Sequence, residues 1–198
     1  MSTTKITGTG LGLPTADGAA LGGASNEFSD LYLADGSVIY FGADQEVKVT
    51  HVADTGLTLK HTATADDKPI SLTLQTGETD MAANDIIGAI NFQAPDEGTG
   101  TDAVLVAAAI KAYAEGDFSS SSNATTLGFY TGASEAAAIK MTLSSAGLLT
   151  LVGALSVDDA TQSTSGTTGS IHTDGGLGIA KDLVVVGDIN AANGAEGT

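Results

Sequence analysis

Apolar and polar residues alternate with a period of two along much of the chain, which is the pattern of β-strands. Leu31 and Leu33 flank a tyrosine, and Val47 and Val49 alternate with charged or polar neighbours. In the run 38–41 both sets of positions are apolar, which is typical of a strand that is buried on each side. The runs of strand length are 31–33, 38–41, 46–50, 57–59, 70–74, 86–92, 102–115, 127–130, 139–143 and 148–151.

Short turns rich in glycine, serine and aspartate separate these runs and predict hairpins between consecutive strands. Residues 34–36, 53–56 and 144–147 are turns of this kind, and Gly56 suits a position with positive φ. When Gly56 is placed over Gly147, apolar residues coincide on both sides of the two turns, which suggests a recurring hairpin unit. We therefore predict an all-β fold, an antiparallel β-meander or sandwich.

Residues 102–115 (DAVLVAAAIKAYAE) are the stretch in which helix and strand compete most closely. The alanine content favours a helix on propensity alone. However, Ile110 and Ala112 alternate with Lys111 and Tyr113, and glycine-rich turns flank the stretch on both sides. We predict a strand here, with a short helix as the alternative.

The two ends of the chain differ in composition from this β-rich body. Residues 1–27 are mostly small, with only scattered large apolar residues, and are predicted to form an extended arm that orders along a neighbouring subunit; the alternative is a disordered tail. Residues 158–170 contain no large apolar residue, and apolar residues return among the glycines of 177–186. We predict three parts: the arm, a body over 28–157, and a linker with a glycine- and valine-rich C-terminal β segment over 158–198.

The core of such a fold has to be built from small side chains. The chain has no Trp, 5 Phe and 4 Tyr against 26 Gly, and it has no Cys. Thin sheets that stack on themselves or on symmetry mates need few large side chains, whereas an enzyme usually needs more of them to enclose a site. The absence of cysteine excludes disulfides, thiolate metal sites and cysteine nucleophiles. The composition therefore favours a fibrous or repetitive β protein.

The charge balance restricts the partners. Lys and Arg total 7 against 24 Asp and Glu, which gives a formal net charge of -17. Such a surface repels phosphate backbones and anionic membranes, so neither nucleic acid nor membrane is expected as a partner. No apolar run has the length of a signal peptide or a membrane span. We expect a soluble product that stays in the cytoplasm until it is incorporated into an assembly.

The titratable residues do not form a recognisable catalytic or metal-binding pattern. His51, His61 and His172 are far apart in the sequence, and His51 with the nearby Asp54 is interpreted as a surface pair. The acidic loop residues offer oxygen ligands to Ca²⁺ but lack the spacing of a calcium loop, so they are interpreted as solvated carboxylates: Asp96, Glu97, Asp102, Asp158 and Asp159.

The glycine-rich runs 8–12 and 175–178 do not match a phosphate loop, and Lys181 lacks the context of a phosphate-binding lysine. These glycines are expected to serve tight turns and close packing around an axis. Asn123-Ala124-Thr125 matches a glycosylation acceptor, a pattern that is common by chance. We predict a protein that is not an enzyme, and we assign no catalytic, cofactor-binding or metal residue.

Two segments resemble structural proteins of bacteriophage virions. Residues 107–151 are similar to a module of phage tail fibres in which a strand ends in Ala-x-Ala-Glu-Gly, followed by a serine-rich loop, a Leu-x-Phe-x-Thr strand and a strand into Ser-x-Gly. Residues 158–189 contain Thr-Thr-Gly, Gly-Gly-x-Gly-Ile-Ala-Lys and Val-Gly-Asp-Ile blocks similar to those that space such fibres. Residues 29–59 and 70–100 also resemble virion proteins of marine phages.

The resemblance implies a virion component, a homotrimer whose strands wrap a common axis and contact major capsid or tail proteins. The short chain fits a head-decoration (cement) protein or a short fibre better than a long receptor-binding fibre. One alternative is a trimeric adhesin that binds host surface glycans through exposed aromatic residues: Tyr113, Phe118, Phe129 and Tyr130. A second alternative is a polysaccharide hydrolase on a β-helix, which the shortage of paired acidic residues disfavours.

Overall fold

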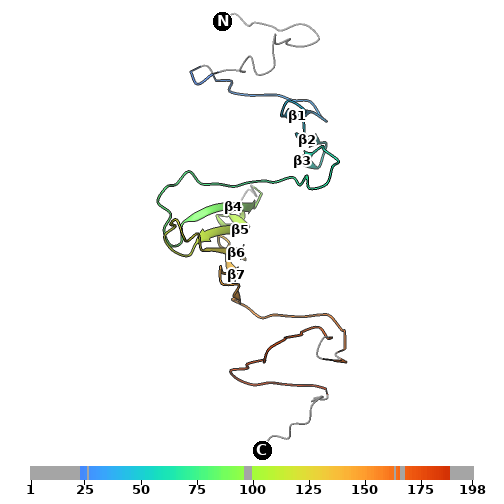
Figure 1. The fold of residues 1–198 in the computed structure, drawn as a ribbon, viewed down its shortest axis with the longest axis vertical. Coiled ribbons are helices and arrows are strands. Elements are labelled where there is room, and N and C mark those ends of the chain that lie inside the picture. The colour runs from blue at the N-terminus through green and yellow to red at the C-terminus, as the bar shows by residue number, and fades with distance from the viewer. Residues whose placement is uncertain (1–22, 26, 96–99, 163, 166–167, 188–198) are drawn as a thin grey trace, which may run out of the picture. The chain divides into compact units, whose positions relative to one another are not determined.

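The computed structural model describes residues 23–25, 27–95, 100–162, 164–165 and 168–187. The chain divides into two compact units, Met1–Thr73 and Leu74–Thr198. Each unit contains one antiparallel sheet in which every strand pairs with the strand that follows it in the sequence (Figure 1). The predicted body of 28–157 therefore contributes to both units.

The first unit holds a three-stranded sheet made of two hairpins. Its strands are β1 (Val38–Phe41), β2 (Val47–Val52) and β3 (Gly56–His61), in the order β1-β2-β3. Ile39, Val49 and Leu59 are register partners, so their side chains share one face of the sheet. Tyr40, Lys48 and Lys60 are partners on the other face, which is polar.

The second unit holds a five-stranded sheet in the order β4-β5-β6-β7-β8. A 3₁₀ turn, η1 (Asp102–Val104), leads into the second strand of this sheet. The strands are β4 (Ile86–Gln93), β5 (Val106–Ala114), β6 (Thr125–Thr131), β7 (Ala138–Leu143) and β8 (Leu149–Leu151). Register shifts interrupt the β4–β5 pairing and the β6–β7 pairing, between Phe129 and Tyr130 in the latter case.

The all-β, antiparallel meander predicted from the sequence is confirmed. Residues 102–115 form the predicted strand over Val106–Ala114, and the helical tendency is confined to the three residues of η1. The alternation around Ile110 and Lys111 prevails over alanine propensity because residues 108–113 of β5 pair with β4 on one side and with β6 on the other.

The turns also lie where the sequence predicts them. Ser37 N donates to Ala34 O at 3.1 Å, and Gly56 has φ 144°. The two hairpins that resemble each other in sequence differ by two positions in their pairing: Val52 pairs with Gly56, whereas Leu143, which aligns with Val52, pairs with Leu149, and Gly147 lies inside the turn with φ 78°. The recurring unit is therefore a shared hairpin motif and not a residue-by-residue repeat.

Four predicted strand segments differ from what the described residues of the single chain form. Residues 31–33 and 70–74 have the periodicity of strands but no strand assignment, because a strand needs a neighbour for its backbone hydrogen bonds. The run 38–41 forms β1 but is not buried on both faces, since Ile39, Tyr40 and Phe41 are all at least 40% exposed. Within the described residues 168–187 no strand is assigned, so the predicted C-terminal β segment is not formed there.

The single chain encloses very little core. Among the described residues, the buried hydrophobic side chains are those of Ala109 and Ala114, and the buried polar one is that of Thr126. Many large apolar side chains are exposed, because among the described residues of each unit no second sheet covers the apolar face of the one that is present. The two faces of each sheet are therefore the candidate interaction surfaces.

Candidate functional site

The histidines do not assemble a catalytic group. His51 on β2 lies 3.6 Å from Asp35 Oδ1, measured from its Nδ1, so the carboxylate nearest to it belongs to the turn before β1 and not to Asp54. His61 Nδ1 accepts a hydrogen bond from Ala63 N at 3.2 Å, and His172 Nε2 lies 3.2 Å from Asp174 Oδ1. Each histidine has local partners of its own.

The described part of the chain contains no group of three His, Asp or Glu residues that could hold a metal ion. Asp96 and Glu97 lie outside the described residues. Asp159 Oδ1 accepts hydrogen bonds from Thr161 Oγ1 at 2.8 Å and Thr161 N at 3.1 Å, and these bonds lower the pKa of that carboxyl. Asp158 accepts from Ser156 Oγ at 3.1 Å. Asp158 and Asp159 are exposed, and their carboxylates accept hydrogen bonds from residues two positions away in the sequence.

The second glycine-rich run has open space around it in the single chain. A Cβ added to Gly175, Gly176 or Gly178 would meet nothing within 4 Å. The packing around an axis expected at these glycines involves neighbouring chains and stays a prediction. The first run, residues 8–12, lies outside the described residues.

One face of the five-stranded sheet carries an aromatic and polar cluster, called here the tyrosine face: Lys111, Tyr113, Thr126, Gly128, Tyr130, Thr142 and Thr150. The register places these residues on one face because Lys111 pairs with Gly128 and Tyr113 pairs with Thr126. A hollow of about 360 Å³ lies on this face, lined by Asn84, Ile86, Lys111, Tyr113, Tyr130 and Ile139.

The absence of a side chain at Gly128 leaves room for the two tyrosine rings. A Cβ at this position would lie 2.8 Å from Tyr130 Cε2 and 3.2 Å from Tyr113 Cε1, so the rings lie over the glycine. Lys111 Nζ lies 4.7 Å from the centre of the Tyr130 ring, which is the geometry of a cation–π contact. Partial burial raises the pKa of Tyr130, and the neighbouring Tyr113 contributes to the rise.

The aromatic residues named from the sequence are not all together. Tyr113 and Tyr130 share the tyrosine face, but Phe129 is the residue before Tyr130 and projects to the opposite face. Phe118 follows β5, and its backbone N donates to Met81 O at 3.0 Å. Lys111, Asn84 and Ile86 complete the hollow and were not singled out from the sequence. The alternation of residues along β5 predicts that Lys111 and Tyr113 share a face. The positions of Asn84 and Ile86 beside them follow from how residues 84–86 pair with the end of β5, which the alternation does not reveal.

The opposite face of the same sheet is apolar from edge to edge, and we call it the apolar face. Its central row joins one register partner from each of the five strands: Ile90, Ile110, Phe129, Met141 and Leu151. A second row runs beside it: Gly88, Ala112, Leu127, Leu143 and Leu149. Phe92 and Ala108 form the next pair on this face.

Six side chains of the apolar face are between 37% and 56% exposed: Ile90, Phe92, Leu127, Leu143, Leu149 and Leu151. A monomeric protein rarely exposes a contiguous apolar patch of this kind unless a partner covers it. The apolar face is therefore the strongest candidate for an interaction surface among the described residues.

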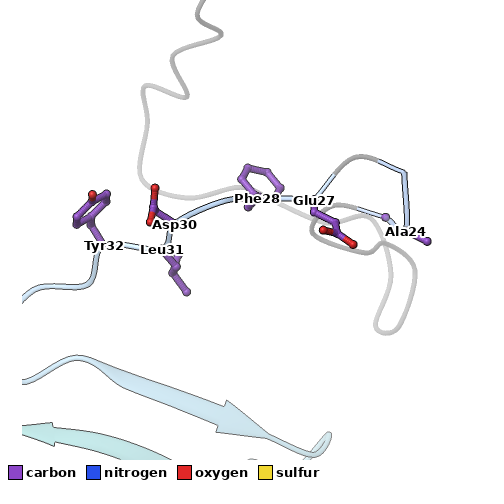
Figure 2. Close-up of a pocket in the computed structure, with 7 residues that line it drawn as sticks. Ala24, Glu27, Phe28, Asp30, Leu31 and Tyr32 are labelled. Carbon is purple, nitrogen blue, oxygen red and sulfur yellow. The ribbon is translucent and has the colours of Figure 1, made fainter. Parts of the chain in front are cut away.

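The first unit contains two further hollows. One of about 290 Å³ lies on the apolar face of the three-stranded sheet and is lined by Leu31, Leu33, Ala34, Ser37, Ile39, Val49, His51 and Leu57. The other, of about 660 Å³, follows residues 23–32, where Phe28 and Tyr32 project to one side of the backbone and Leu31 to the other (Figure 2). Its lining includes Glu27 and Asp30, and Ser29 Oγ donates to Asp30 Oδ2 at 3.0 Å.

No protein-family model matches the chain, and the search of curated proteins gave no match. No helix in the described parts of the chain is long and apolar enough to cross a membrane. The two faces of the five-stranded sheet are therefore the features of the chain that indicate a function.

Proposed function

We propose that this chain is a non-enzymatic structural protein of a bacteriophage virion, a capsid-decoration (cement) protein or a short fibre, that acts as a homotrimer. In this proposal it assembles on the particle surface with major capsid or tail proteins and either stabilises the particle or projects from it. Its mechanism is mechanical, because chains that share a sheet interface unfold only when their common contacts break.

The observation that carries the proposal is the exposure of the apolar face in the single chain. Two complete rows of apolar side chains cross the sheet, and Leu74 packs over Gly88 at the β4 end of one of them. Taking a large aliphatic side chain from full exposure to full burial contributes about 1.5–3 kcal/mol, and these half-exposed side chains would each contribute part of that amount. A sheet of this composition is therefore expected to reach its full stability in an oligomer.

The charge distribution supports a particle-bound role. A net charge of -17 opposes nonspecific association, and the residues of the two apolar rows are all uncharged. Copies can therefore meet through this face while the acidic residues remain in solvent. The resemblance of residues 107–151 to a tail-fibre module is the reason why we propose that this assembly is part of a virion.

Two measurements test the proposal. Light scattering at physiological salt should give the mass of three chains, and a mass of one chain would remove the trimer. Peptide mass spectrometry and immunogold labelling of purified particles of the phage that encodes the chain should detect it on the head or the tail. Its absence from purified particles would refute the virion role even if the protein is a trimer.

A second candidate function, a surface adhesin that binds host glycans, is favoured by the tyrosine face. Tyr113 and Tyr130 lie side by side with Lys111 and Asn84 around a hollow of about 360 Å³. Sugars stack their apolar faces on aromatic rings and donate hydroxyl hydrogen bonds to polar neighbours. Binding to isolated host-surface glycans that is lost in Tyr113→Ala and retained in Phe118→Ala would support this candidate, and an absence of glycan binding would exclude it.

A further inference from the structure

The charges on the strands have the opposite sign to the charge of the whole chain. The chain carries 24 Asp and Glu against 7 Lys and Arg, yet the strands β1 to β8 of the described chain contain no Asp or Glu. Apart from histidine, the charged residues of these strands are Lys48, Lys60, Lys111 and Lys140. The acidic residues therefore lie outside the strands, and the sheets themselves carry positive charge.

Lys111 is not placed as a lysine that protects the edge of a sheet. Lysines on edge strands prevent the pairing of sheets from different chains, because a charge opposes association at the open edge. β5 is an interior strand that pairs with β4 and β6, so Lys111 lies away from both edges. Its register partners are Ala89 on β4 and Gly128 on β6, which are small and uncharged. Another reason is needed for a cation in the middle of this face.

No carboxylate forms an ion pair with Lys111 within the described part of the chain. The ion pairs found there involve histidines and not lysines. Lys111 Nζ lies instead 4.7 Å from the centre of the Tyr130 ring, and the lysine is partly buried. An ammonium group has three donors and no acceptor, and a contact with a ring face leaves donors for an anion. The sheet does not provide that anion.

The carboxylates nearest in sequence to the lining of the hollow are bound by other donors. Glu115, which follows β5, accepts hydrogen bonds from Ser145 and Thr126. Asp85, which precedes β4, accepts one from Ala82 N at 2.7 Å. Exposed charges more than about 8 Å apart are largely screened at physiological ionic strength, so the acidic loops oppose an anion at Lys111 only weakly.

The rest of the lining fits a sugar ring. Tyr113 and Tyr130 lie together over Gly128, and Asn84 and Ile86 complete the wall beside them. Aromatic rings provide a rigid apolar surface with a polar hydroxyl at one end, and the amide offers both donors and an acceptor. The volume of about 360 Å³ lies within the range of about 300–1,000 Å³ that is usual for small-molecule sites.

We propose that this hollow binds a sugar residue that carries a carboxylate, a hexuronate or a sialic-acid unit, and that Lys111 recognises the carboxylate. The ammonium group donates to the carboxylate oxygens while the sugar ring packs against Tyr113 and Tyr130. An acidic peptide side chain reaches the ammonium group but has no ring to cover the two tyrosines. A charge-assisted hydrogen bond is stronger than a neutral one, so the site selects acidic over neutral sugars. The inference rests on the glycan-binding candidate above and adds the class of sugar.

Titration calorimetry of the full-length protein at physiological salt tests the proposal with matched sugars. Trigalacturonate and sialyllactose are each compared with their own methyl ester, which keeps the ring and removes the charge. We expect the acids to bind about ten- to a hundredfold more tightly than the esters, the range of a hydrogen bond to a charged group. In Lys111→Met the acids should bind no more tightly than the esters, and the affinity of the esters should be unchanged.

Two further variants separate the charge from the rings. Lys140→Met removes the same charge from β7 of the same sheet, and Lys140 does not line the hollow, so this variant should retain the preference for acids. Tyr113→Ala should weaken the binding of acids and esters by the same factor, because it removes ring surface and no charge. Circular dichroism checks that each variant keeps its β structure.

The outcomes separate this inference from the functions proposed above. Equal affinities for acids and esters, or a preference that persists in Lys111→Met, overturn the inference and leave glycan binding intact. Hexaglutamate bound as tightly as trigalacturonate would show that the site recognises charge alone, which also overturns it. An absence of binding to all four sugars overturns it too, whereas the mass of the particle and the presence of the chain on virions do not depend on any of these results.

Discussion

Glu115 at the end of β5 accepts two hydrogen bonds from Ser145, a residue 30 positions later in the turn between β7 and β8. Ser145 N lies 2.7 Å from Glu115 Oε1, and Ser145 Oγ lies 2.6 Å from Glu115 Oε2. Thr126 Oγ1 on β6 also donates to Oε1 at 2.7 Å. One carboxylate thus connects β5, β6 and the turn between β7 and β8 at one end of the sheet.

These hydrogen bonds predict an acid-sensitive turn. The side-chain bond from Ser145, then its backbone bond and the bond from Thr126, hold the pKa of Glu115 below its ordinary value of 4.5. Because the folded-state pKa is lowered, the stabilisation is fully present above about pH 4.5 and is lost as the pH falls through the folded value. We expect the Ser145 amide to lose hydrogen-exchange protection, corrected for intrinsic rates, as the pH falls through the lowered pKa of Glu115.

Glu115→Gln is the test variant for this prediction. It should lower the protection of Ser145 at neutral pH and should abolish the extra loss at acid pH, because the amide does not titrate in this range. Asp159→Asn is the control, since the pKa of Asp159 is also lowered, by its own bonds with Thr161. Parallel pH profiles for the native protein and Glu115→Gln would contradict the assignment.

Gly128→Ala should disturb the tyrosine face with only a modest loss of stability. The new methyl group would meet Tyr130 Cε2 at 2.8 Å and Tyr113 Cε1 at 3.2 Å, and the rings can move outward because they are partly exposed. We expect a loss of about 1 kcal/mol, at the lower end of the range for overpacking, with clear shifts of both tyrosine ring resonances. Gly116→Ala, where a Cβ meets nothing within 4 Å, should shift neither ring.

Gly132→Ala should be more damaging than Gly128→Ala for a reason that depends on backbone atoms. A Cβ at Gly132 would lie 2.5 Å from Glu135 O and 3.6 Å from Ala107 O. Relief requires a shift of backbone that Gly132 N anchors to Ala107 O at 2.9 Å. We expect a loss near the upper end of about 1–3 kcal/mol, measured by denaturant unfolding. An equal loss for the two glycine variants would contradict this explanation.

Much of the fold follows from local alternation in the sequence. Ile110 and Lys111 lie on opposite faces of β5 as their alternation predicts, and Gly147 lies in the predicted turn. The same criterion predicts strands at 31–33 and 70–74 that the structure does not contain. Alternation shows which face of a segment is apolar, but it does not show whether a neighbouring strand is present to pair with it. Leu74 instead contacts Gly88, a long-range pairing that periodicity cannot reveal.

The candidate surfaces depended on register, which the sequence does not specify by itself. Ile90, Ile110 and Phe129 are recognisable as apolar strand residues, yet only the pairing of β4, β5 and β6 places them in one row. The shift between Phe129 and Tyr130 also sets which β7 residues join that row. The bond between Glu115 and Ser145 was equally hidden, because it crosses an intervening strand.

Lys111→Met should weaken the tyrosine face by removing its cation. Lys111 Nζ lies 4.7 Å from the centre of the Tyr130 ring, and a cation–π contact at an exposed site contributes about 0.5–1 kcal/mol. The methionine retains much of the aliphatic side chain, so the loss in unfolding free energy should stay within that range. If the tyrosine face binds a glycan, the same variant should weaken binding, since Lys111 lines the hollow.

Lys140→Met is the matched control for this last prediction, because it removes the same charge from an exposed position on β7 of the same sheet. Both variants make the net charge more negative by one, so general repulsion changes equally in the two proteins. A greater loss in Lys111→Met than in Lys140→Met, which disappears when Tyr130 is also changed to Leu, isolates the contact between the lysine and the ring. Equal losses would show that only net charge matters, and the rings of the tyrosine face would then be held by Gly128 and the strand register alone.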